Sequence, residues 1–150
     1  MDIAAALWGG IIGAIAAAVV YAGFLALSWT RFDLIRFEGG LLARERSNMV
    51  YLYGVLVNIV AGALLALGYR YVFQQIDSAS YIGWGALLGL VQGVVALLLL
   101  PVLGLVNHNV RSGDEEHPGF AGLGGGVLTP VAVVTASVVF GLWVGLVLVP

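Results

Sequence analysis

Four long apolar stretches, separated by polar segments, make up most of the chain. They cover residues 3–28, 49–73, 81–106 and 127–149, and Arg70 is the one charged residue within them. An α-helix rises about 1.5 Å per residue, so each stretch can cross a hydrocarbon core of about 30 Å. The pattern predicts an all-α fold, an integral membrane bundle of four transmembrane helices in a single domain over residues 1–150.

Small residues recur at every fourth position within these stretches. Because four residues return a helix to nearly the same direction, each series lies on one face, where another helix can approach closely in lipid. We expect these faces to pack the four helices tightly together, and we also expect self-association or membership of a larger membrane complex. The glycines predicted to form the helix-packing faces are Gly9, Gly13, Gly54, Gly62, Gly85, Gly89, Gly93, Gly141 and Gly145.

The connecting segments differ in length and chemistry. Residues 74–80 form a connection so short that the second and third stretches are predicted to be antiparallel neighbours. Residues 30–48 mix four arginines with bulky apolar residues around Gly39 and Gly40. This mixture is typical of a segment that lies along lipid headgroups, and a partner-docking or anion-binding loop is the alternative.

The two halves of the chain share a pattern of tryptophan and small residues. This similarity indicates two repeated helix hairpins, related by an axis along the membrane normal. The alternative is that small residues at this spacing occur in many packed membrane helices. The corresponding positions are Trp8, Gly9, Gly13 and Ala17 with Trp84, Gly85, Gly89 and Gly93, and Asn58, Gly62 and Ala66 with Ser137, Gly141 and Gly145.

Composition supports the membrane class and excludes several others. The chain is 61% hydrophobic and 9% charged, whereas soluble domains are about half apolar and a quarter charged. It has no cysteine, which excludes disulfides and thiolate metal sites, and its net charge of −2 gives no basis for nucleic-acid binding. We therefore expect the lipid bilayer as its main partner, with bound lipid and no cofactor.

The distribution of arginine predicts an orientation. Loops 29–48 and 107–126 together hold five arginines, and the opposite side of the membrane has only Arg70. Cytoplasmic loops carry the excess of basic residues. Both loops should therefore be cytoplasmic and both termini outside, with the chain integral to the cytoplasmic membrane.

Asn58, Gln92 and Ser137, joined more weakly by Thr135, are the polar residues predicted to lie deep within the spans. Amides and hydroxyls at such depth either tie helices together or line a path for a small solute or ion. No ionisable residue falls near the middle of a span, which argues against an intramembrane proton relay.

A second candidate site lies in the loop after the third span. His108, His117, Asp114 and Glu116 are weak candidates for a metal site, since imidazole and carboxylate groups suit zinc or another divalent ion. Their spacing matches no compact ligand motif, so a solvated acidic loop is the default interpretation. The chain carries no recognisable enzyme signature.

The segments Thr30–Leu34 and Pro118–Leu123, together with Thr129 and Pro130 before a glycine-rich last span, give the chain a resemblance to a known family. It resembles small four-span prokaryotic membrane proteins of unknown function. The resemblance implies a four-span fold and no activity. Members often carry histidines within their spans, at places that correspond to Asn58, Gln92 and Ser137 here. A role in haem or metal ligation that depends on those histidines is therefore not expected.

Three functions remain open. The first is a non-catalytic structural or accessory subunit that packs through its glycine faces. The second is a channel or transporter for a small solute or ion, lined by Asn58, Gln92 and Ser137. The third is a metal-dependent membrane protein that uses His108 and His117.

Overall fold

The computed structural model describes residues 2–43, 49–76 and 80–149. These residues form helices and turns, with no strand among them. The helical elements are α1 (Ile3–Ala26), α2 (Leu34–Gly40), α3 (Met49–Gln75), α4 (Tyr81–Val106), α5 (His108–Arg111), the 3₁₀ helix η1 (Phe120–Gly125) and α6 (Thr129–Val147).

The predicted all-α membrane fold is confirmed. Four helices, α1, α3, α4 and α6, are long and apolar enough to cross a membrane. Helices α1 and α6 are slightly shorter than the apolar stretches that contain them, whereas α3 continues to Gln75. The chain is thus a multi-pass membrane protein with four candidate spans.

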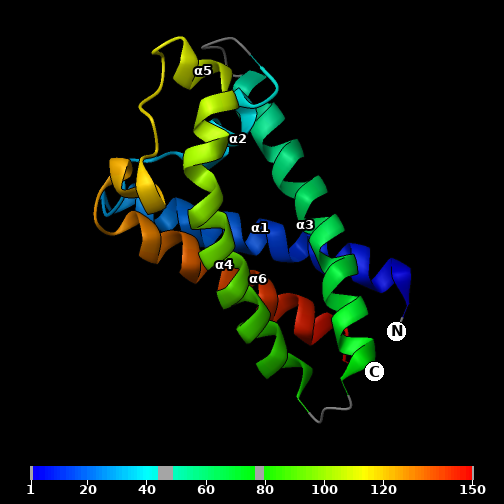
Figure 1. Ribbon diagram of the computed structural model, residues 1–150. Helices are drawn as coiled ribbons and strands as arrows, with labels where there is room; N and C mark the ends of the chain where they lie inside the picture. The colour runs from blue at the N-terminus through cyan, green and yellow to red at the C-terminus, as the bar shows by residue number, and fades with distance from the viewer. Residues whose placement is uncertain (1, 44–48, 77–79, 150) are drawn as a thin grey trace.

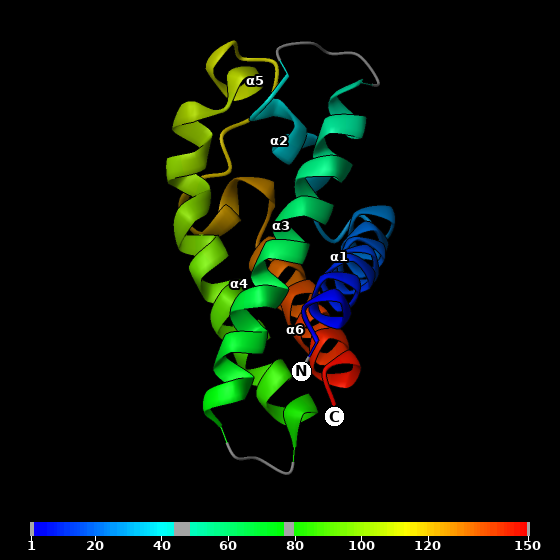
Figure 2. The ribbon, with the colours of Figure 1, turned by 90° about the vertical axis from the view of Figure 1, so that its right-hand side faces the viewer.

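The four long helices form two pairs that cross obliquely. Helices α1 and α6 lie side by side, and α3 and α4 run across them in antiparallel directions (Figures 1 and 2). Helix α4 packs mainly on α6, and α3 packs on α1 and α2, whereas α3 and α4 contact each other very little. The predicted antiparallel course agrees with the short connection, and a hydrogen bond from Tyr69 to Gln92 and a ring contact of Phe73 with Tyr81 join the two helices. Their glycines, however, face other elements of the chain.

Glycines make the closest contacts between helices. A Cβ atom added at Gly85 would overlap the backbone of Gly141, and one added at Gly89 would overlap the backbone of Ser137. In the other half of the chain, a Cβ atom at Gly10 would overlap the backbone of Gly62. The glycine faces of α4 and α6 therefore point into the fold, where the absence of a side chain lets the backbones approach.

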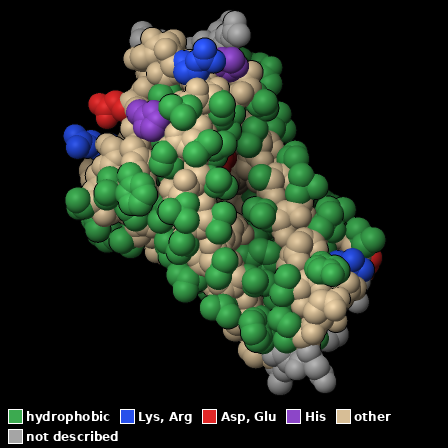
Figure 3. Space-filling view, viewed as in Figure 1, with side chains coloured by type: hydrophobic (Ala, Val, Ile, Leu, Met, Phe, Trp, Pro, Cys, Tyr) green, Lys and Arg blue, Asp and Glu red, His purple; other side chains and the backbone are tan. Residues whose placement is uncertain are grey.

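Polar side chains lie near the ends of the molecule and apolar ones cover its middle (Figure 3). Residues with exposed apolar side chains include Val19, Leu64 and Leu105. In a soluble protein such a surface would drive aggregation, but in a bilayer it faces acyl chains as apolar as itself.

The course of residues 30–48 along lipid headgroups stays a prediction. Within this segment, helix α2 packs on α3, and its Phe37 is only 1% exposed. Some of the apolar residues of the segment therefore hold this short helix against the spans. The sequence offers Ser47 or Asn48 as the N-terminal cap of the second span, and both lie outside the described residues.

Candidate functional site

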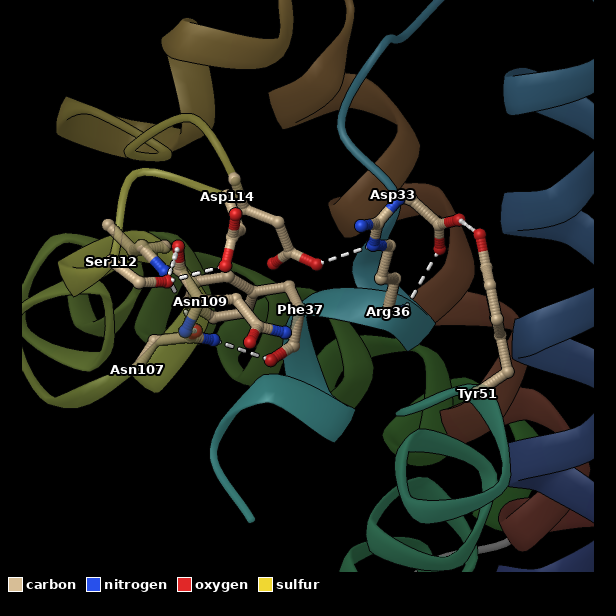
Figure 4. Close-up of polar contacts among 10 residues, drawn as sticks. Asp33, Arg36, Phe37, Tyr51, Asn107, Asn109, Ser112 and Asp114 are labelled. Atoms are coloured by element: carbon tan, nitrogen blue, oxygen red, sulfur yellow. Dashed lines mark hydrogen bonds and ion pairs between the residues drawn. The ribbon is translucent and has the colours of Figure 1, made fainter. Parts of the chain in front are cut away.

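The site is built around α2, whose start is fixed by Asp33. One carboxylate oxygen of Asp33 accepts a hydrogen bond from the backbone N–H of Arg36 at 3.0 Å, which caps the helix. The other oxygen accepts a hydrogen bond from the hydroxyl of Tyr51 at 2.8 Å, and Figure 4 shows this link between α2 and α3. A single side chain thus begins α2 and attaches it to a neighbouring span.

The loop after α4 holds α2 from the other side. The side-chain amide of Asn107 donates a hydrogen bond to the carbonyl oxygen of Phe37 at 2.7 Å, and Arg36 forms an ion pair with Glu115 at 2.7 Å (Figure 4). Burial raises the pKa of Glu115, and Arg36 opposes that shift. The acidic loop is therefore partly folded over α2 and is not simply solvated.

Two glycines let α2 pack closely on α3. A Cβ atom at Gly39 would overlap the carbonyl oxygen of Val50, and one at Gly54 would overlap the carbonyl oxygen of Ile35. Each helix thus lacks a side chain where the other presents a carbonyl group. This close approach brings the residues at the end of α2 between the spans.

A cavity of about 380 Å³ lies between α2 and the four spans. Most of its lining is apolar and comes from α1, α2, α3, α4 and α6. The exposed residues Ala61 and Leu65 of α3 and Leu99 of α4 belong to this lining, so the cavity reaches the surface between α3 and α4. Figure 3 shows a hollow there, with an acidic side chain at its bottom.

The structure brings together the three polar residues singled out from the sequence. Asn58 of α3, Gln92 of α4 and Ser137 of α6 all line the cavity, although they come from different spans. Gln92 accepts a hydrogen bond from the hydroxyl of Tyr69 at 2.8 Å, which ties α3 to α4 beside the cavity. The fourth candidate, Thr135, is not among the lining residues.

Glu38, near the end of α2, is the cavity residue that sequence reasoning missed. Asn58 is hydrogen-bonded to its carboxyl group, while its Oε2 atom is buried and lacks a hydrogen-bond partner among the described residues. Burial raises the pKa of Glu38 from 4.5 to about 8, and the Asn58 hydrogen bond opposes the shift. An acid that takes up a proton near neutral pH therefore faces the cavity.

The absence of ionisable residues near the middle of the spans does not extend to the cavity. Glu38 reaches the cavity from a connection, since α2 carries it there. The local signal was the Gly39–Gly40 pair directly after Glu38, together with Gly54 on the next span. Glycines in both elements permit close approach, but their positions alone do not show that the two elements meet.

The weak metal candidates are not gathered into a ligand set. Within residues 2–43, 49–76 and 80–149, no group of three or more His, Asp and Glu side chains could hold a metal ion. Ser112 donates a hydrogen bond to Asp114 at 2.8 Å, and Nδ1 of His117 accepts one from the backbone of Gly119 at 3.0 Å. Both contacts are local and stabilise turns of the loop.

Comparisons of the chain with protein-family models, curated proteins and solved structures find no match. What the chain does must therefore be inferred from the geometry of the site.

Proposed function

We propose that this protein binds a small, mainly apolar molecule in the cavity, with access from the bilayer through the gap between α3 and α4. The observation that carries the proposal is an apolar cavity of about 380 Å³ into which one carboxyl group and two amides project. Small-molecule sites typically measure 300–1,000 Å³ and combine an apolar lining with a few polar groups that orient the ligand.

The position of the opening supports entry from lipid. The side chains of Leu65, Val95 and Leu99 line the cavity and are between 42% and 49% exposed. In a bilayer these side chains face acyl chains, so a lipophilic molecule can pass between them without first crossing a polar surface. Transport or storage of such a molecule is a more specific form of the channel or transporter hypothesis drawn from the sequence.

The side chains that line the cavity agree better with binding a molecule than with catalysing a reaction. Among the described residues that line the cavity, Glu38 and the phenol of Tyr21 are the ionisable groups. Tyr21 donates a hydrogen bond to the carbonyl oxygen of Phe32 at 2.8 Å, so its hydroxyl already has a structural role. One carboxyl group without a second acid or base is a poor basis for acid-base catalysis.

The alternative function is a structural or accessory subunit, expected from glycine-rich helix faces and from spans without charged groups near their middle. Gly85 and Gly89 of α4 meet α6 within the same chain, and Gly62 of α3 meets α1. These faces therefore supply no surface for a second protein, and self-association would have to use other residues.

For the orientation, we infer from the arginine distribution that α2 and α5 lie toward the cytoplasm and both termini lie outside. The two termini lie together, away from α2 and α5, which is compatible with this arrangement (Figure 1).

Photolabelling tests the binding proposal. The protein in lipid nanodiscs is irradiated with a diazirine analogue of 1-octanol, and labelled residues are mapped by mass spectrometry. We expect saturable labelling of α3 and α4 around Ala61, Leu65, Val95 and Leu99, competed by excess 1-octanol. Labelling that does not saturate and spreads over all lipid-facing residues would overturn the proposal.

A matched pair of variants locates the entrance. Ala61 lines the cavity, whereas its neighbour Val60 is exposed on α3 outside the lining. Ala61→Trp places an indole in the opening and should abolish the saturable labelling. Val60→Trp adds the same ring toward lipid and should leave it intact.

A further inference from the structure

The distinctive feature of the cavity is a carboxyl group that has no charge partner among the described residues. Arg36 of α2 forms an ion pair with Glu115, and neither residue lines the cavity. No basic side chain in the described part of the chain forms an ion pair with Glu38. Its Oε2 atom is buried and has no hydrogen-bond partner in the part of the chain that the structure describes. A carboxylate in such surroundings must either hold a proton or find a cation.

Within residues 2–43, 49–76 and 80–149, the groups around Glu38 supply no such cation. The lining contains the phenol of Tyr21 from α1, Asn58 from α3, Gln92 from α4 and Ser137 from α6. On α2 itself, Arg36 is paired with Glu115, and Asp33 accepts hydrogen bonds from Tyr51 and from the backbone of Arg36. The remaining cavity wall is apolar, so a cation bound there needs an apolar body.

We propose that the cavity takes a lipophilic amine in its ammonium form, with Glu38 as the counter-ion, and that this cation competes with a proton for the carboxyl group of Glu38. This proposal rests on the function proposed above and specifies its ligand class. The ammonium group donates to Oε2, which is the buried acceptor left without a partner, while the hydrocarbon part contacts the apolar wall.

The chemistry also disfavours amphiphiles that carry a negative charge. An anionic phosphate or carboxylate in the cavity would meet Glu38 and no basic residue of the described lining. A simple amine is therefore favoured over an amine-bearing phospholipid, whose phosphate lies next to its amine.

Competition between proton and amine gives the proposal a measurable signature. Since the pKa of Glu38 is about 8, the carboxyl group is mostly protonated at pH 6 and must release that proton to bind a cation. An alkylamine has a pKa near that of lysine, about 10.4, and stays charged in this range. Its apparent affinity should rise about tenfold from pH 6 to pH 7, rise further to pH 8, and then level off.

The experiment measures binding of tritiated octylamine to the protein in phosphatidylcholine nanodiscs, with binding to empty discs subtracted. The neutral probe is tritiated 1-octanol, which has the same chain without the charge. We expect octylamine binding to depend on pH as described and octanol binding to be independent of pH.

Variants assign the effect to Glu38. Glu38→Gln should reduce octylamine affinity at pH 8 at least tenfold and remove its pH dependence, while octanol still binds, which also shows that the cavity is folded. Glu38→Asp, which keeps the charge, should retain a pH-dependent preference for octylamine. Glu116→Gln removes an exposed carboxylate and should match the wild type.

The outcomes separate this inference from the function on which it rests. Octylamine binding that is unchanged in Glu38→Gln, or independent of pH in the wild type, would overturn the inference while saturable octanol binding still supports the cavity. Absence of saturable binding for both probes would overturn both proposals. Octylamine binding should be unchanged when the discs contain phosphatidylethanolamine, and a fall would overturn the preference for a simple amine over an amine-bearing phospholipid.

Discussion

Glu38 is the residue whose surroundings differ most from what its place in the sequence suggests. Its neighbours along the chain, Gly39 and Phe37, are buried, and its own carboxyl group faces an apolar cavity. Burial favours the neutral acid, while Asn58 stabilises the charged form through a hydrogen bond. Glu38 should therefore affect both the stability of the fold and the chemistry of the cavity.

The raised pKa of Glu38 predicts how stability depends on pH. The unfolded carboxyl loses its proton near pH 4.5 and the folded one near pH 8, so the folded state holds more protons between these values. Stability should therefore fall as pH rises through this window, by at most about 1.4 kcal/mol per pH unit, and level off above it. Thermal unfolding in detergent between pH 5 and 9 measures this dependence.

Glu38→Gln should flatten that curve, so the variant becomes more stable than the wild type at pH 8 and resembles it at pH 5. The pKa of Glu115 is raised as well, so some slope remains, and Glu115→Gln provides the correction. Parallel curves for the wild type and Glu38→Gln would contradict the burial of this carboxyl group.

At the scale of elements, α2 acts as a short helix inserted between spans. Asp33 begins it, Gly39 and Gly54 let it approach α3, and Asn107 holds its end. None of these contacts is large, but together they fix where Glu38 lies. The cavity therefore depends on the packing of α2 against α3 and the loop after α4.

Substitutions at two glycines of α3 test the contact between α2 and α3. Gly54→Ala places a methyl group against the carbonyl of Ile35, which must move, so we expect a loss of about 1–3 kcal/mol in stability and weaker octanol binding. Gly68→Ala is the control, because no atom lies within 4 Å of its added Cβ and alanine favours the helix by up to about 1 kcal/mol. Chemical or thermal unfolding in detergent compares them, and equal effects would show that α2 does not press on α3.

Asn107 tests the contact from the other side of α2. Its side chain is completely buried, donates to the carbonyl of Phe37 and accepts from the backbone of Asn109 and Val110. Asn107→Ala should cost about 1–3 kcal/mol in stability because it leaves buried partners unsatisfied. It should also speed proteolysis within residues 107–126.

The control for Asn107→Ala is Arg111→Ala in the same loop. Arg111 is exposed, and its substitution should change stability by no more than about 0.5 kcal/mol. A comparable loss in both variants would point to general sensitivity of the loop and not to the contact with α2.

At the scale of the whole molecule, the two crossed helix pairs explain why a cavity exists at all. Helices α4 and α6 close on their glycine faces, as do α1 and α3, whereas α3 and α4 contact each other very little. Oblique pairs cannot touch along their full length, so space remains between them. Helix α2 fills part of that space, and the cavity is the part that remains beside it.

The orientation of the whole molecule is testable because the chain has no cysteine. Ser112→Cys places a thiol in the arginine-rich half and Asp2→Cys places one near the N-terminus. In intact cells, a membrane-impermeant maleimide should label Asp2→Cys, whereas Ser112→Cys should be labelled only after the membrane is permeabilised. The reverse pattern would contradict the orientation inferred from arginine.

The sequence by itself determined the membrane class, the four spans and the polar residues Asn58, Gln92 and Ser137 that line the cavity. These features depend on local composition and on helical periodicity, which a linear reading captures. The internal repeat and the family resemblance stay predictions.

Only the tertiary structure decided which helices touch and where Glu38 points. Glycine faces show that close packing is possible but do not name the partner, so α4 could be assigned to α6 only from the fold. The environment of Glu38 depends on contacts with α3 and with the loop after α4, which are far away along the chain. Burial of a charged group is a property of such distant contacts, and a local pattern of residues does not contain it.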